Sequence, residues 1–367
     1  MEAGNAAKEG VQRGYPDAEV TVRPLADGGE GTVRALTECM QGTVEKVMVT
    51  GPLGEPVKAE YGRIPQSRTA VIEMSSAAGL TLVGEQERNP LHTTTFGVGE
   101  LIRHAVQRGC RHFIIGIGGS ATNDGGVGML QALGYDFLDR NGRQVPYGAK
   151  GLSMIEEISD KHVMPELQAC TFRVACDVTN PLCGKQGCSA VFGPQKGADP
   201  AMIESMDQWL AHFAHLTQEK YPVADMEHPG TGAAGGMGFA FLSYTNAVLE
   251  SGTRIIFEET KLESYIREAD IVVTGEGRLD AQTVMGKAPI GVAQLAAKYH
   301  KKVIAFSGCV TEDAGVCNRH GIDAFFPILR NVSSPEEALD PVNARENMTA
   351  AVEQVFRLIY CIQISAL

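Results

Sequence analysis

The residues best suited to chemistry lie in a polar stretch in the last third of the chain. An apolar run, Ile271–Thr274, leads into Gly275-Glu276-Gly277-Arg278-Leu279-Asp280, and Lys287 follows shortly after. Two carboxylates can hold Mg²⁺ and two cations can meet phosphate oxygens, which is the equipment of phosphoryl transfer. A solvated loop held by salt bridges is the alternative interpretation of the same residues.

These side chains need a strand before them and a helix after them to form a site. The run 271–274 predicts a buried strand, and the two glycines that follow are expected to break it and let a ligand approach the backbone. Pro289 suits the first turn of a helix that continues to about Lys298. This order places the polar residues at the carboxyl end of a strand, where ligands bind in open α/β sheets.

A similar arrangement occurs near the beginning of the chain. Glu19–Leu25 alternates in polarity and predicts a strand. The loop Asp27-Gly28-Gly29-Glu30-Gly31 follows, and then a helix from Thr32 to about Met40. The two acids either bind a ligand or cap the helix and compensate its dipole. Three glycines exceed what one cap requires, and this favours ligand binding.

A third polar loop, Gly116–Gly126, follows the predicted strand His112–Ile117. Its backbone N–H groups, together with Ser120, Thr122 and Asn123, predict a cradle for phosphate or carboxylate. The spacing Gly116-x-Gly118-x-x-Ala121 also fits the relaxed dinucleotide fingerprint. The loop is longer and more polar than that tight turn, so a nicotinamide-dependent oxidoreductase is the weaker alternative.

Other elements complete an α/β pattern. A predicted strand at 172–176 delivers Asp177 and Asn180, a turn at 192–197 presents Lys196, and a glycine loop at 230–238 leads into a predicted helix at 239–250. Further helices are expected at 2–13, 97–108, 127–133, 202–215 and 338–365, an antiparallel hairpin at 44–49 and 57–61, and a strand at 69–74. Strands alternating with helices indicate the α/β class.

Composition excludes several classes of protein. The 367 residues suffice for two domains. A formal net charge of −12 argues against nucleic acid as a main partner. The absence of any 18-residue apolar run predicts no membrane span, and the first residues do not resemble a signal peptide.

The cysteines indicate a reducing compartment. Nine are scattered along the chain, and an odd count fits free thiols. Cys183 and Cys188 are separated by four residues, without a second such pair, which is weak support for zinc. A cytoplasmic location is therefore expected.

Six motifs in a fixed order resemble those of bacterial-type class I glycerate kinases. They are Ala26–Thr32, Gly116–Gly126, Ala175–Leu182, Phe192–Ala198, Gly232–Gly238 and Thr274–Asp280. The similarity extends from about Tyr15 to about Pro327. The fixed order of several motifs argues against chance.

The resemblance implies ATP-dependent phosphorylation of D-glycerate at the 2-hydroxyl, giving 2-phosphoglycerate, with Mg²⁺. It also implies two α/β domains. One is flavodoxin-like and built from both chain ends, 1–42 plus 262–367. The other is restriction-endonuclease-like and inserted as 43–261. D-glycerate is the implied small-molecule partner, and a homo-oligomer is compatible with the resemblance.

The resemblance also suggests roles for individual residues, with the site expected in a cleft between the domains. Asp177 or Asp280 would deprotonate or orient the glycerate hydroxyl. Lys196 or Lys287 would neutralise donor oxygens, and Arg278 or Gly118–Ser120 would receive the glycerate carboxylate. Substrate or phosphate binding is expected at Asp27, Gly28, Gly29, Glu30, Gly118, Gly119, Ser120, Asn123, Asp124, Asn180, Gly235, Gly236, Gly275, Glu276 and Arg278, and metal binding at Glu276 and Asp124. Which loop binds ATP and which binds glycerate stays open.

Two departures from the family pattern carry expectations of their own. The chain starts inside the first helix, without the strand and Asp-Ser-Phe/Tyr-Lys loop that usually precede it. Reduced stability and activity are therefore expected, and a catalytically impaired remnant that still binds glycerate or nucleotide is a further alternative. The segment Met74-Ser75-Ser76-Ala77-Ala78-Gly79-Leu80 replaces Met-Ala-Ala-Ala-Ser-Gly-Leu, which can alter the substrate site.

Overall fold

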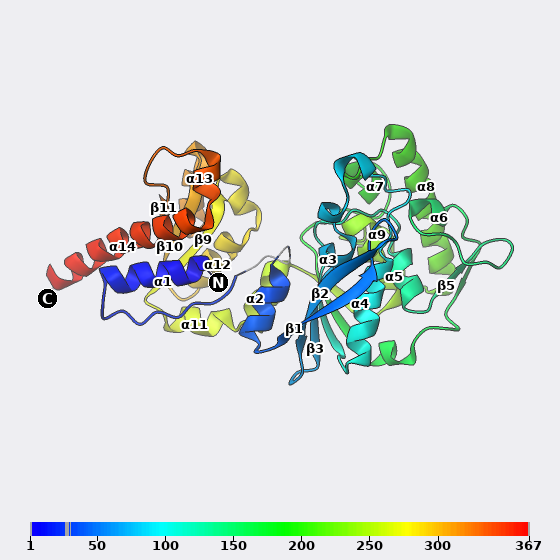
Figure 1. The fold of residues 1–367 in the computed structure, drawn as a ribbon, viewed down its shortest axis with the longest axis horizontal. Helices are drawn as coiled ribbons and strands as arrows, with labels where there is room; N and C mark the ends of the chain where they lie inside the picture. Colours follow the sequence, from blue (N-terminus) through cyan, green and yellow to red (C-terminus); the bar gives the residue numbers. More distant parts are fainter. Residues whose placement is uncertain (1, 26–28, 30, 366–367) are drawn as a thin grey trace. The chain divides into compact units, whose positions relative to one another are not determined.

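The computed structural model describes residues 2–25, 29 and 31–365, and the chain forms two compact units (Figure 1). The smaller unit comprises Met1–Asp27 and Phe257–Leu367, and the larger unit comprises Gly28–Ile256. Both units combine helices with a sheet, as expected for the α/β class.

The larger unit is built on a six-stranded sheet in the order β1-β2-β3-β4-β7-β8. Its strands are β1 (Thr43–Thr50), β2 (Pro56–Ile64), β3 (Thr69–Glu73), β4 (His112–Gly116), β7 (Thr171–Ala175) and β8 (Ala247–Glu250). The first three are antiparallel, which confirms the predicted hairpin, and β3, β4, β7 and β8 run parallel. The parallel strands therefore bring the loops that follow β4 and β7 to one edge of the sheet.

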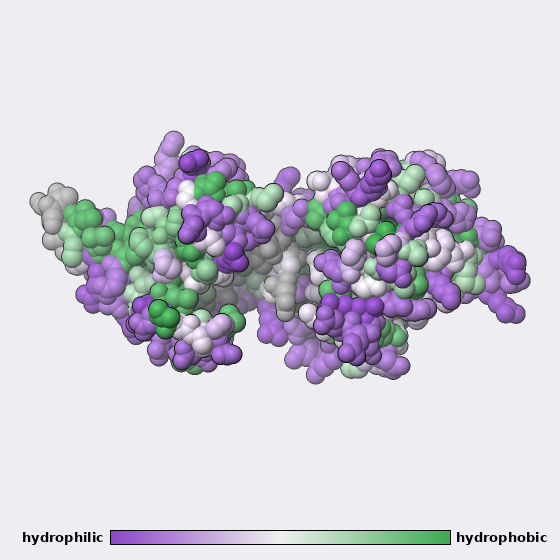
Figure 2. Space-filling model, turned by 90° about the horizontal axis from the view of Figure 1, so that it is seen from above, coloured by the Kyte–Doolittle hydropathy of each residue, from purple (hydrophilic) through white to green (hydrophobic). Residues whose placement is uncertain are grey.

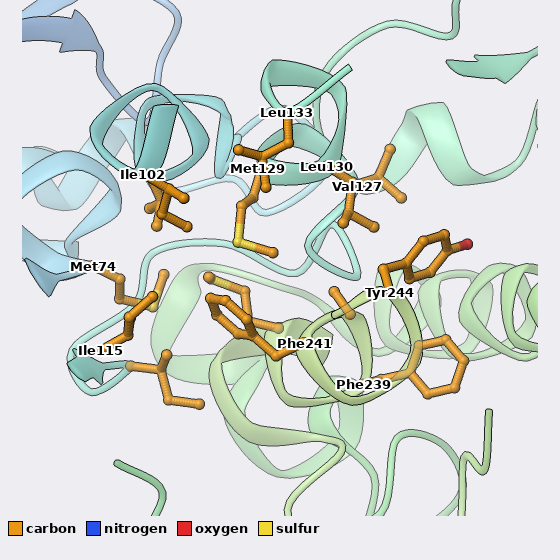
Figure 3. Close-up of a cluster of buried hydrophobic side chains, with 14 of the residues drawn as sticks. Met74, Ile102, Ile115, Val127, Met129, Leu130, Leu133, Phe239, Phe241 and Tyr244 are labelled. Carbon is orange, nitrogen blue, oxygen red and sulfur yellow. The ribbon is translucent and has the colours of Figure 1, made fainter. Parts of the chain in front are cut away.

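Helices and a small second sheet surround these strands. The α-helices are α2 (Thr32–Cys39), α3 (Ser75–Ala78), α4 (Phe96–Gln107), α5 (Val127–Ala132), α6 (Ala149–Leu152), α7 (Cys188–Phe192), α8 (Pro200–Lys220) and α9 (Ala233–Tyr244), and β5 (Asp136–Leu138) pairs with β6 (Glu157–Ser159). Figure 3 shows part of the core, in which Met129 from α5 and Phe241 from α9 lie among apolar side chains. This core fixes the starting points of α5 and α9, which flank the polar loop after β4.

The smaller unit has a parallel sheet in the order β11-β10-β9. Its strands are β9 (Ile271–Leu279), β10 (Lys302–Val310) and β11 (Ala324–Pro327), and its helices are α1 (Glu2–Gly14), α11 (Leu262–Glu268), α12 (Ala288–Ala297), α13 (Pro335–Leu339) and α14 (Pro341–Ser365); α10 (Gly252–Glu259) spans the boundary between the units. One apolar cluster contains α12 and another contains α1 and α14. Helices α1 and α14 pack so closely that only glycine fits at position 10: a Cβ there would lie 2.5 Å from the Thr349 carbonyl oxygen.

The surface in Figure 2 is largely hydrophilic, with apolar residues gathered at the end that carries the carboxyl terminus. On α14, Leu358 and Ile362 are about three-fifths exposed, at 62% and 61%. No helix among the described residues is long and apolar enough to cross a membrane.

Three predicted elements differ in the structure. Glu19–Leu25 forms no strand; Val20 and Leu25 instead pack their side chains against the two apolar clusters of the smaller unit. Residues 247–250 form strand β8 and not helix, because they pair with β7. Strand β9 continues through Gly275 and Gly277 to Leu279, since β10 supplies ladder partners along that length.

The boundaries between the units also differ from the predicted ones at 42/43 and 261/262. Helix α2 lies in the larger unit, where it packs against β2 and β3. The absence of a side chain at Gly62 of β2 lets α2 approach the sheet closely, because a Cβ there would overlap the Thr37 side chain of α2. The structure therefore assigns the helix after the first glycine loop to the larger unit.

Candidate functional site

The loop after β4 exposes backbone donors at the carboxyl edge of the large sheet. Gly118 and Gly119 are exposed, and Gly119 adopts a φ of 71°, in the left-handed region that favours glycine. No described residue accepts a hydrogen bond from the amide N–H of either glycine. The loop is held from below, because Leu80 donates its N–H to the Gly119 carbonyl and Ala121 donates to the Ala78 carbonyl.

Lys196 lies directly behind this loop. Its side chain comes from the short turn after α7 and is 2% exposed. The ammonium donates to Ser120 Oγ at 2.8 Å and to the Thr122 carbonyl oxygen at 2.6 Å. It forms no ion pair with any described carboxylate. Burial lowers the pKa of Lys196 to about 8, opposed by the fields of the Cys188 thiol and the Asp124 carboxyl.

Asp124 fixes the far end of the loop from a position that is only 1% exposed. Its Oδ2 accepts hydrogen bonds from Thr95 N–H at 2.8 Å and Thr95 Oγ1 at 2.9 Å, and its Oδ1 accepts one from Gly126 N–H at 3.1 Å. Burial raises the pKa of Asp124, and these hydrogen bonds oppose the rise. Donors from Thr95, which precedes α4, and from Gly126 of the loop surround the carboxylate, so Asp124 anchors the loop in this structure; metal binding by Asp124 stays a prediction.

The glycine motif at 230–238 packs against the same loop. The Gly235 carbonyl accepts a hydrogen bond from Gly125 N–H at 2.9 Å, and a Cβ at Gly235 would lie 2.1 Å from the Thr122 carbonyl oxygen. Ala234, Gly235 and Gly236 all have left-handed dihedral angles, which is a strained conformation for the alanine. Close backbone contact therefore explains Gly235, and a Cβ at Gly236 would likewise lie 2.8 Å from the Gly125 Cα.

Asn123 belongs to this polar layer as well. Its Nδ2 donates to Ser189 Oγ at 2.8 Å, while its Oδ1 is buried without a partner among the described residues. The hydroxyl of Thr122 is also buried and lacks a hydrogen-bond partner there. The loop thus contains buried polar side chains that are hydrogen-bonded and two buried polar atoms, Asn123 Oδ1 and Thr122 Oγ1, that have no hydrogen-bond partner among the described residues.

Asp177 and Asn180 follow β7, at the same sheet edge as the loop after β4. Asp177 is exposed, and its Oδ1 accepts a hydrogen bond from Gly252 N–H at 3.1 Å. Asn180 donates from Nδ2 to the Gln186 carbonyl at 2.8 Å. Asp177 is the more exposed of the two residues, so its carboxylate is accessible to a ligand.

The second polar stretch lies in the smaller unit, in the last part of β9 and the turn that follows it. Lys287 places its ammonium 3.3 Å from Glu276 Oε2 and 3.9 Å from Asp280 Oδ1. Arg278 pairs with Asp280 at 3.2 Å. The four charged residues singled out in the sequence therefore form one salt-bridged cluster. Salt bridges hold this stretch, and the same four side chains are the ones expected to bind Mg²⁺ and phosphate.

Local structure positions the two acids of this cluster. Asp280 caps the following 3₁₀ turn by accepting a hydrogen bond from Gln282 N–H at 2.9 Å, and Thr283 donates from Oγ1 to Glu276 Oε1 at 2.6 Å. Gly275 cannot carry a side chain, because a Cβ would lie 2.1 Å from the Phe306 carbonyl oxygen. The close pairing of β9 with β10 at Gly275 thus fixes the position of the backbone from which the charged cluster starts.

The remaining predicted site, around Asp27, Gly28 and Glu30, lies outside the described residues, apart from Gly29. The helix that follows is anchored by Glu73, whose Oε1 accepts a hydrogen bond from Val33 N–H at 2.7 Å. Sequence reasoning missed Glu73 and also Thr95, which bonds Asp124. The run of three consecutive threonines at 93–95, all buried, was the available signal for the latter.

The loop after β4 does not have the geometry of a dinucleotide-binding turn. A fingerprint turn leads directly from its first glycines into a helix, but here α5 begins only at Val127. The interval from Gly118 is filled by the buried polar layer. The nicotinamide alternative therefore loses its structural basis.

Comparisons with known proteins agree with one another. A model of the glycerate kinase family matches residues 1–360. The chain is 45% identical to a glycerate kinase of Haemophilus influenzae, with 98% of this chain and 94% of the relative covered, and 48% identical to glycerate 2-kinase of Escherichia coli K12, with 92% and 88% covered. A crystal structure provisionally named glycerate kinase 2, from Salmonella typhimurium LT2, superposes with a TM-score of 0.90 at 46% identity and covers 99% of this chain and 94% of that chain.

Proposed function

Since the chain belongs to the glycerate kinase family, we propose that it transfers the terminal phosphate of ATP to the 2-hydroxyl of D-glycerate, giving 2-phosphoglycerate and ADP. The charged cluster at the end of β9 is the observation that carries the proposal. The 48% identity to a relative named glycerate 2-kinase supports the choice of the 2-hydroxyl.

The cluster at the end of β9 supplies the groups that a phosphate donor requires. Arg278 is 65% exposed at its side chain and Lys287 is 38% exposed, so both cations can exchange their carboxylate partners for phosphate oxygens. The carboxylates of Asp280 and Glu276 are only 13% and 17% exposed, so this exchange requires another cation to take the place of the two side chains beside the acids. Phosphoryl transfer depends mainly on positioning and on stabilising developing charge, and these cations serve both.

The two acids of the cluster fit Mg²⁺. No group of three or more metal-ligating side chains occurs among the residues described by the structure. Mg²⁺ in phosphoryl-transfer sites is usually held by one or two carboxylates together with substrate phosphates, and Glu276 with Asp280 meets that requirement. The ammonium of Lys287 already contacts both carboxylates, which marks the position as suited to a cation. When bound, the metal neutralises charge on the donor phosphates.

The acceptor hydroxyl must lose its proton as the new bond forms. The bond between the terminal phosphorus and the ADP oxygen breaks, the bond to the glycerate 2-oxygen forms, and the hydroxyl proton passes to a carboxylate. Asp280 and Asp177 are the two candidates, each at the end of a parallel strand in its own unit. General-base assistance of this kind contributes about 10²–10⁴-fold to the rate.

A coupled assay of ADP release with D-glycerate, ATP and Mg²⁺ tests the proposal, and NMR of the product distinguishes phosphorylation at the 2-hydroxyl from phosphorylation at the 3-hydroxyl. Glycerate-dependent ADP release with 2-phosphoglycerate as product is expected. Binding of glycerate or nucleotide without turnover would favour the impaired-enzyme alternative and overturn the proposal.

A further inference from the structure

From the contacts of Lys196 and Ser120, we propose that the loop 118–120 of the larger unit holds the carboxylate of the acceptor substrate and that Lys196 acts there as a positioning residue through the Ser120 hydroxyl. The inference rests on the proposed function for the identity of the acceptor. It revises the sequence-based expectation that Lys196 neutralises oxygens of the phosphate donor.

The direction of one hydrogen bond carries the first step. An ammonium group can only donate, so Ser120 Oγ accepts from Lys196 Nζ at 2.8 Å. The hydroxyl hydrogen of Ser120 is then left to donate elsewhere. Ser120 is 8% exposed and adjoins the exposed Gly118 and Gly119. The loop therefore presents a hydroxyl donor next to two backbone N–H groups that have no acceptor among the described residues.

Charge adds the second step. Lys196 uses two of its three ammonium N–H groups, on Ser120 and on the Thr122 carbonyl, and pairs with no described carboxylate. A buried unpaired cation is unfavourable, and an oxyanion at the loop above it would relieve that cost. Asp124 does not fill this role, because its carboxylate bonds to Thr95 and Gly126.

The charge of the site favours a carboxylate over a phosphate chain. One buried cation with a few neutral donors matches a compact anion of single charge. The triphosphate of ATP carries several charges and requires several cations and a metal. The cluster of Arg278, Lys287, Glu276 and Asp280 in the smaller unit supplies these. The two loops thus differ in the class of anion they suit.

The test compares ligand binding to the full-length protein and its variants by calorimetry. The ligands are D-glycerate, its neutral amide D-glyceramide, and a non-hydrolysable ATP analogue with Mg²⁺. The variants are Lys196→Met and Ser120→Ala, with Ser120→Thr to restore the hydroxyl and Lys185→Met as a matched control. Lys185 lies on the same segment of chain and is exposed.

We expect Lys196→Met and Ser120→Ala to weaken D-glycerate about 10- to 100-fold, in keeping with loss of a charge-assisted hydrogen bond. D-glyceramide and the ATP analogue should change less than about threefold. The preference for glycerate over glyceramide should therefore disappear, Ser120→Thr should recover most of it, and Lys185→Met should match wild type. A merely structural role of Lys196 would weaken all three ligands alike and would leave the preference intact.

Proton uptake gives a second readout. The titratable groups facing Lys196 are Asp124 and Cys188. A carboxylate bound near the lysine favours its protonated form, so wild type should take up protons when glycerate binds at pH 8 and Lys196→Met should not. Equal uptake in both proteins would overturn the proposal.

Two outcomes separate this inference from the proposed function. If wild type phosphorylates glycerate but Lys196→Met loses the ATP analogue instead, the loop binds phosphate and the inference is wrong. If wild type neither binds nor phosphorylates glycerate, the proposed function fails and the assignment of the acceptor fails with it.

Discussion

In the larger unit, the loop after β4 keeps its charges inside: Lys196 and Asp124 are 2% and 1% exposed, and neither forms an ion pair with a described side chain. In the smaller unit, the end of β9 places Arg278, Lys287, Glu276 and Asp280 in mutual contact at partly exposed positions. Both regions carry the acids, bases and glycines that indicate anion chemistry in a sequence.

The difference shows how burial divides similar residues between two tasks. In the β9 cluster the cations are the more exposed partners, at 65% for Arg278 and 38% for Lys287, so we expect them to be the groups that can turn to a charged ligand. Buried charges must be held by hydrogen bonds and are costly when unpaired. The loop after β4 is therefore held by many buried hydrogen bonds, and we expect any ligand there to meet a fixed set of donors.

The largest effect is expected from the exposed cluster. Asp280→Asn should lower kcat by about 10²–10⁴-fold, because the variant loses the carboxylate that assists proton transfer or metal binding. Asparagine still caps the following turn, so the fold should survive. Steady-state ADP release measures the effect, and circular dichroism checks the fold.

Asp270→Asn is the matched control, since Asp270 is exposed and precedes the opposite end of β9. It should leave kcat unchanged. Near-wild-type turnover of Asp280→Asn would remove the β9 cluster from catalysis and reverse the comparison between the two loops.

The buried loop should respond to substitution in stability. Asp124→Ala leaves the donors at Thr95 and Gly126 unpaired inside the protein. The free energy of unfolding should fall by about 3–5 kcal/mol, as for other broken buried polar networks. Asp280→Ala should cost only about 0.5–2 kcal/mol, the usual value for a helix cap. Denaturant unfolding of both variants tests this contrast, and equal losses would contradict it.

Stability should also depend on pH through Lys196. Burial lowers its folded pKa to about 8 from the ordinary 10.5. Between these values the unfolded chain binds the proton and the folded protein does not, so stability rises with pH. Relative to Lys196→Met, wild type should gain about 3 kcal/mol in free energy of unfolding from pH 8 to pH 10.5. Parallel pH profiles of the two proteins would show that Lys196 titrates normally.

The smallest effect concerns the backbone that supports the loop after β4. Ala234 has a φ of 54°, which an alanine adopts at a cost. Ala234→Gly should therefore raise the free energy of unfolding by about 0.5–1 kcal/mol, after the extra entropy of glycine in the unfolded chain is subtracted. Ala233→Gly is the control and should lower stability, because Ala233 has ordinary helical dihedral angles. A loss of stability in both variants would mean that Ala234 is not strained.

Local patterns in the sequence predicted much of the fold. Runs of β-formers located β3, β4, β7 and the start of β9, and helical patterns located α1, α2, α4, α5 and α8. Polar glycine motifs predicted two candidate anion sites, one in the loop after β4 and one at the end of β9, because the carboxyl ends of parallel strands emerge at a common sheet edge. These features depend on residues close together in the chain, which is why the sequence by itself determined them.

Only the tertiary structure decided which charges are buried and how far the strands extend. Ser120, Thr122 and Lys196 meet although some 75 residues separate the lysine from the loop, and no local pattern encodes that contact. Likewise, the glycines of β9 remain in the strand because β10 pairs with Gly275 and with the residues on either side of Gly277, and residues 19–25 form no strand although their alternation predicts one. In each case the outcome depends on neighbours distant in sequence, which supply or withhold the hydrogen bonds and the burial that local propensity cannot provide.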